Sequence, residues 1–125
     1  MATFVYGPVA RHTKNVKGSP FKTAANIYAP GKIVFAPFDA KIPHVYKDKT
    51  KCGNPGPGSA QFVLGREELN AKGDRHLTKD RMAVAHIVPV ANLPRHVKKD
   101  APLGTVSGDT LHISTNSPEL MDAVT

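Results

Sequence analysis

The chain has 125 residues, a formal net charge of +7, and 40% hydrophobic against 22% charged residues. This length fits one domain with its own core, and the hydrophobic fraction excludes the composition of a disordered chain. The single cysteine, Cys52, excludes an internal disulfide, and no apolar run approaches the roughly 18 to 20 residues that a membrane helix needs.

Eleven prolines and ten glycines leave few windows for an amphipathic helix, so the sequence favours β structure. The amino terminus has no basic stretch followed by a long apolar core, so no secretory signal is expected. We predict an extended N-terminal arm over residues 1–20, a β domain over 21–116, and a C-terminal tail or short helix over 117–125. Strand-like runs lie at 3–6, 32–36, 41–46, 61–64, 82–90, 103–107 and 110–114. Short strands joined by tight turns predict antiparallel pairing.

Two polar stretches interrupt these strands. Residues 47–59 are rich in lysine, glycine and proline, and we expect a projecting loop there because proline cannot donate to a strand ladder. Residues 66–81 have no full apolar face, which indicates a loop with at most a short helix. At the C-terminus, Ser117 and Pro118 stand where a helix cap and a first helical residue are expected, so a short helix should begin there.

Several motifs follow one another in a recognisable order. Residues 22–27 read Lys-Thr-Ala-Ala-Asn-Ile, and residues 31–37 read Gly-Lys-Ile-Val-Phe-Ala-Pro. Later come Val-Ala-His-Ile at 84–87, Leu-Gly-Thr-Val-Ser-Gly at 103–108 and Thr-Leu-His-Ile at 110–113. In this order and spacing the chain resembles the lysostaphin-type zinc endopeptidases, which cleave peptidoglycan cross-bridges. The resemblance covers residues 21 to about 114. It implies an all-β fold, a single-domain antiparallel sheet or sandwich resembling the duplicated hybrid motif, with long loops and extended termini.

The metal ligands of that family are mostly replaced here. The family's H-x-x-x-D segment corresponds to Lys22 and Asn26, and its H-x-H segment to Thr110 and His112, while His86 matches the remaining active-site histidine. A charged lysine donates and does not coordinate, and an amide is a poor zinc ligand. A catalytic zinc needs three protein ligands, so the single ligand His112 is not enough. The resemblance therefore implies a pseudoenzyme with vestigial positions Lys22, Asn26, His86, Thr110 and His112, and with no catalytic residues, metal or cofactor.

Other catalytic patterns are absent from the sequence. It contains no G-x-S-x-G elbow and no glycine-rich phosphate loop. Cys52 lies among glycines and prolines, where we interpret it as an incidental thiol. The remaining histidines, His12, His44, His76 and His96, are not spaced two or four residues from another histidine, the spacings that present two ligands on one face. Chain folding could still gather them.

The basic residues predict a surface for a partner. Those that we expect to face a partner are Lys14, Lys17, Lys47, Lys49, Lys51, Arg95, Lys98 and Lys99. Such charge would attract an acidic protein surface or nucleic acid. No row of stacking aromatics accompanies it, which argues against a dedicated nucleic-acid role.

The resemblance suggests a non-catalytic structural or binding protein of a bacteriophage virion, either a capsid decoration (cement) protein or a tail protein, made in the host cytoplasm. Its partners would be capsid or tail subunits, with a homo-oligomer also open and no membrane involved. Two alternatives remain: a zinc peptidoglycan endopeptidase, and a basic β-barrel that binds nucleic acid.

Overall fold

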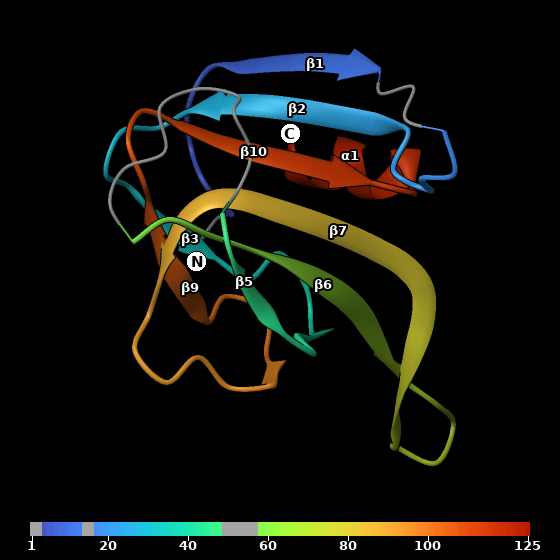
Figure 1. The fold of residues 1–125 in the computed structure, drawn as a ribbon. Coiled ribbons are helices and arrows are strands. Elements are labelled where there is room, and N and C mark those ends of the chain that lie inside the picture. The colour runs from blue at the N-terminus through green and yellow to red at the C-terminus, as the bar shows by residue number, and fades with distance from the viewer. Residues whose placement is uncertain (1–3, 14–16, 49–57) are drawn as a thin grey trace.

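The computed structural model describes residues 4–13, 17–48 and 58–125, which form strands and one short helix (Figure 1). The strands are β1 (Val9–Thr13), β2 (Thr23–Tyr28), β3 (Ile33–Phe35), β4 (Ala40–Lys41), β5 (Val45–Lys47), β6 (Ala60–Leu69), β7 (Arg75–Pro89), β8 (His96–Val97), β9 (Pro102–Val106) and β10 (Thr110–Thr115), and the helix is α1 (Pro118–Val124). The predicted all-β, antiparallel class is confirmed.

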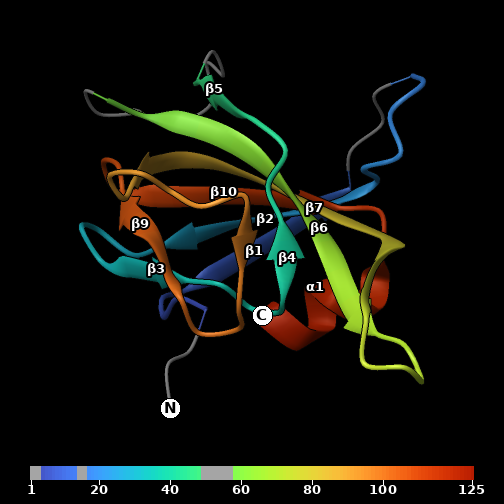
Figure 2. The same cartoon turned by 90° about the horizontal axis from the view of Figure 1, so that it is seen from below.

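The strands form one open antiparallel sheet in the order β1-β2-β10-β7-β6-β4-β8. β9 pairs with β3 and β7, and β5 pairs with β6. The long strand β7 joins the parts of this sheet, because residues 82–85 pair with β10 and residues 87–89 pair with β9. Helix α1 packs against β10 and β2, as the view from below shows (Figure 2).

The central strands direct every second side chain into the apolar core, although many residues of their other face are also buried. Ile27 of β2 and Leu111 and Ile113 of β10 have no exposed surface, and they share the core with Leu103 of β9 and Met121 of α1. Burying each such side chain contributes about 1.5 to 3 kcal/mol. Because successive strand residues point to opposite faces, the residues between these core positions all meet on the outer face. Asn26 and His112 are among them.

The N-terminal arm predicted over 1–20 is wrong for residues 4–13. Phe4 and Val5 are buried in the core cluster, and β1 pairs with β2 along its whole length, from Val9 opposite Ile27 to Thr13 opposite Thr23. The strand expected at 3–6 is not formed by the described residues 4–6. Every residue of β1 is exposed, so the sequence carries no alternating pattern that could reveal this strand.

The loop predicted over 66–81 is also wrong. β6 and β7 continue through it as a long hairpin, with Leu69 opposite Arg75 and a turn between them. The amide oxygen of Asn70 accepts hydrogen bonds from the backbone N–H groups of Lys72 and Asp74, at 2.9 and 3.0 Å, and so closes the turn. The hairpin projects from the body of the sheet (Figure 1). Its polar sequence reflects this exposure rather than a lack of regular structure.

The C-terminal helix is confirmed. The Ser117 hydroxyl accepts a hydrogen bond from the backbone N–H of Leu120 at 3.3 Å, and Pro118 is the first helical residue. Most of the loop expected at 47–59, including Cys52, lies outside the described residues. Within the described parts of the chain, no helix is long and apolar enough to cross a membrane.

Candidate functional site

Asn26 and His112 form the centre of the candidate site. They stand directly opposite each other on β2 and β10, and His112 Nδ1 lies 2.7 Å from Asn26 Oδ1. An amide oxygen only accepts, so Nδ1 carries the hydrogen and donates it. On its other side His112 lies opposite Ala85 of β7. His112 is only 7% exposed.

Two further imidazoles approach His112. The ring of His12, on β1, has its centroid 5.7 Å from that of His112, and the ring of His86, on β7, lies at 6.3 Å. The three histidines come from three different strands. His12 was not among the predicted site residues, because its place depends on β1, which the sequence pattern did not reveal. We call His12, Asn26, His86 and His112 the histidine cluster.

His86 occupies an irregular position inside β7. Its φ is 64°, in the left-handed region that non-glycine residues rarely adopt. Its neighbours Ala85 and Ile87 pair with Gln61 and Ala60, two consecutive residues of β6, so His86 is an extra residue at a β-bulge. At this point β7 changes partner from β10 to β9. The bulge therefore aims the His86 ring toward His112 while the strand bends.

Asp48, which follows β5, holds this bulge in place. Its Oδ2 lies 2.8 Å from the backbone nitrogen of His86 and 2.9 Å from His86 Nδ1. The Ser59 hydroxyl donates to the same oxygen at 2.9 Å. On the far side, the His86 carbonyl accepts a hydrogen bond from the backbone N–H of Ser107 at 2.8 Å. The Asp48 side chain has no exposed surface and that of His86 has 4%, so water hardly competes for these contacts.

The chemistry of the cluster follows from these contacts. In a neutral imidazole only one ring nitrogen keeps a lone pair. Because Nδ1 of His112 faces an oxygen acceptor, the lone pair of its neutral ring is on Nε2. Such a ring can accept a proton or a hydrogen bond. His86 Nδ1 lies 2.9 Å from the Asp48 carboxylate. Within residues 4–13, 17–48 and 58–125, no three His, Cys, Asp or Glu side chains are placed to hold a metal ion.

The predicted positions divide into two groups. Asn26, His86 and His112 come together, whereas Lys22 directly precedes β2 and lies four residues from Asn26, which corresponds to about 13 Å if the chain is extended there. Thr110 lies opposite Tyr28, two residues along β10 from His112 and about 7 Å away. In an extended chain, the Lys22 and Asn26 positions are too far apart to hold one ion together.

The basic residues predicted to face a partner lie in separate parts of the sheet. Lys17 follows β1, while Arg95, Lys98 and Lys99 flank β8 at the other end of the strand order. Lys47 ends β5. All five of these residues are exposed, and Lys14, Lys49 and Lys51 lie outside the described residues.

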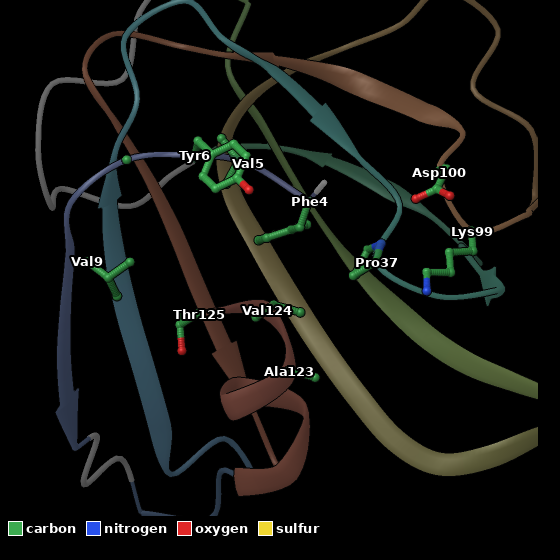
Figure 3. A pocket seen from close by; sticks show the side chains of 11 residues that line it. Phe4, Val5, Tyr6, Val9, Pro37, Lys99, Asp100, Ala123, Val124 and Thr125 are labelled. Carbon is green, nitrogen blue, oxygen red and sulfur yellow. The ribbon is translucent and has the colours of Figure 1, made fainter. Parts of the chain in front are cut away.

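A separate groove of about 450 Å³ lies between the N-terminal segment and the end of α1 (Figure 3). Its lining residues are Phe4, Val5, Tyr6, Gly7, Val9, Pro37, Lys99, Asp100, Ala123, Val124 and Thr125. Val9 and His12 are three residues apart on β1, so they lie on opposite faces of that strand. The groove is therefore separated from the histidine cluster by the sheet.

No protein-family model matches this chain, and neither does any curated protein.

Proposed function

We propose that the protein is a non-catalytic structural or binding domain, built on a peptidase-like scaffold without a working zinc centre. The observation that carries this proposal is the hydrogen bond between Asn26 and His112. The amide that stands in the family's carboxylate position is engaged with the one retained ligand, His112. A neutral amide supplies no negative charge to offset a divalent cation, and zinc takes nitrogen, sulfur or carboxylate ligands.

The acid nearest to the cluster does not restore such a centre. One oxygen of Asp48 already accepts hydrogen bonds from the His86 backbone N–H and the Ser59 hydroxyl, and it lies 2.9 Å from His86 Nδ1. These contacts fix the bulge, and recruiting the carboxylate to a metal would release them. A structural role for Asp48 is therefore favoured over ligation.

For the biological setting we propose a bacteriophage virion, in which the domain would decorate a capsid or form part of a tail. The motif order from residue 22 to 113 supports this setting through its resemblance to the lysostaphin-type peptidases. The net charge of +7 suits docking onto acidic subunits. The alternative of a closed nucleic-acid-binding barrel is disfavoured, since the sheet is open.

Metal analysis and a cleavage assay on the purified full chain test the absence of catalysis. The protein, supplied with zinc and then dialysed, should retain no stoichiometric metal and leave peptidoglycan cross-bridge peptides intact. Stoichiometric zinc together with cleavage that a chelator abolishes would establish the endopeptidase alternative instead. For the virion setting, the chain should sediment with assembled capsids or tails and withstand added salt, whereas nucleic-acid binding would weaken steeply with salt.

A further inference from the structure

Strand β1 forms an edge of the sheet whose outer backbone groups have no partner strand among the described residues. The backbone N–H of Tyr28 donates to the Pro8 carbonyl at 2.9 Å, so Pro8 and Tyr28 form a hydrogen-bonded pair. Hydrogen-bonded and non-hydrogen-bonded pairs alternate along antiparallel strands. Ala10 and His12 therefore turn their backbone groups toward β2. Val9, Arg11 and Thr13 turn theirs outward.

The usual devices that protect a sheet edge are weak at β1. Natural edges are blunted by bulges, by very short strands, or by charged side chains. The pairing of β1 with β2 is regular over all five residues, without a register shift. Its one permanently charged side chain, Arg11, is bound to Asp122 of α1, with Nη1 and Oδ1 2.7 Å apart, and also to Thr125. The guanidinium group is thus engaged with the helix.

The charge around this edge selects the kind of partner. The first 38 residues, which supply both β1 and β2, contain the basic residues Arg11, Lys14, Lys17, Lys22 and Lys32 and no aspartate or glutamate. The acid that contacts β1 is Asp122 of α1, which pairs with Arg11. A second copy of the chain, paired antiparallel about the centre of β1, would bring two Arg11–Asp122 ion pairs together and double the local excess of basic residues. Such an excess disfavours pairing with a like-charged copy. An acidic segment would instead find complementary charge.

We propose that β1 binds an extended, acidic peptide segment of a partner protein by strand addition, using the outward backbone groups of Val9, Arg11 and Thr13. Main-chain hydrogen bonds provide the affinity in this mode of recognition, and the side chains of the added strand provide its selectivity. The inference builds on the proposed binding role by naming a surface and a partner class for it. It does not involve the histidine cluster.

Hydrogen exchange on the full chain tests the strand addition directly. The probe is a blocked heptapeptide in which glutamate and valine alternate, and its control carries lysine in place of glutamate. With the acidic peptide, the amides of Val9, Arg11 and Thr13 should exchange about tenfold more slowly, since they gain a partner. The amides of Ala10 and His12, which already face β2, should change little, and the lysine peptide should protect none of them.

A pair of variants distinguishes the contribution of the backbone hydrogen bond to peptide binding from that of the side-chain charge. Arg11→Pro removes the central outward donor, and proline is tolerated on an edge strand where its missing N–H faces solvent. Arg11→Ala is the matched control, because it loses the same charge and ion pair but keeps the N–H. The proline variant should bind the acidic peptide about tenfold more weakly than the alanine variant. If Arg11→Pro does not fold, Thr13→Pro against Thr13→Ala makes the same comparison.

Equal affinity of the proline and alanine variants would overturn the proposal, and so would protection confined to residues outside β1. A peptide-free dimer in which the Val9, Arg11 and Thr13 amides are already slow would overturn it in favour of a second copy. None of these measurements involves zinc or cleavage. Failure here therefore leaves the proposed function standing, and cleavage activity would refute that function without deciding what β1 binds.

Discussion

One carboxylate oxygen of Asp48 faces both the backbone nitrogen and the ring Nδ1 of His86, at 2.8 and 2.9 Å. The two residues are 38 positions apart. This contact connects the end of β5 to the bulge where β7 leaves β10 for β9. A left-handed histidine in the middle of a strand is strained, and such strain persists only where the surroundings hold it. The contacts of the Asp48 carboxylate with His86 stabilise this strained backbone conformation.

Asp48→Asn should therefore destabilise the fold strongly. The amide keeps the shape of the side chain, but it removes the charge that its donors face in a site without exposed surface. Breaking a buried charged contact costs about 3 to 5 kcal/mol, and we expect a loss near the lower value because the amide oxygen still accepts. Urea denaturation of the variant and the wild type measures this loss in the free energy of unfolding. Asp122→Asn is the control, since its pairing with Arg11 is exposed and should change stability by under about 1 kcal/mol.

The stability of His86 variants should depend more on whether the new residue tolerates a left-handed backbone than on the size of its side chain. Asparagine tolerates the left-handed region, whereas valine is branched at Cβ and does not. Both variants lose the ring contact with Asp48. The free energy of unfolding of His86→Val should consequently be about 1 to 3 kcal/mol lower than that of His86→Asn. Equal stabilities in chemical denaturation would show that the bulge relaxes when the histidine is removed.

The sequence predicts the core strands of this fold better than its edges. The apolar runs at 103–107 and 110–114 correspond closely to β9 and β10. β10 alternates apolar with polar residues, and β9 has its buried Leu103 and Val106 beside turn residues that mark its ends. β1 is exposed throughout, and the hairpin beyond residue 66 is largely exposed, so neither carries a hydrophobic period. The cap at Ser117 is recognisable since capping is a local interaction.

The residues of the candidate site are likewise predicted only in part from the sequence. Asn26, His86 and His112 are identified in advance by the resemblance, and the structure gathers them. His12 and Asp48 are missed, because each reaches the cluster only through long-range pairing of its strand or loop. Lys22 directly precedes β2, and from Thr23 to Tyr28 the chain is an extended strand. Spacing along the sequence could not tell that strand from a tighter segment.

Gly104 should be irreplaceable for a steric reason. A Cβ atom built on this residue would lie 2.2 Å from the Val88 carbonyl oxygen, which belongs to backbone and cannot move aside cheaply. Gly104→Ala would force β9 away from β7, and we expect a loss of about 2 to 4 kcal/mol, comparable with other severe packing errors. Gly31→Asn is the control. Its surroundings are open and its φ of 65° suits asparagine, so thermal unfolding should change little.

Asn26→Asp should create a weak metal site that we expect the wild-type chain to lack. The substitution places a carboxylate oxygen where the amide oxygen lies, 2.7 Å from His112 Nδ1, with the His12 ring centroid 5.7 Å from that of His112. Zinc would displace the hydrogen from His112 Nδ1, after which one carboxylate and two imidazoles form a donor set that zinc accepts. Calorimetric titration with zinc should show binding of about micromolar strength, and the further change His112→Ala should abolish it. If Asn26→Asp folds normally but binds no zinc, the prediction is wrong, and the amide at residue 26 is not what prevents metal binding.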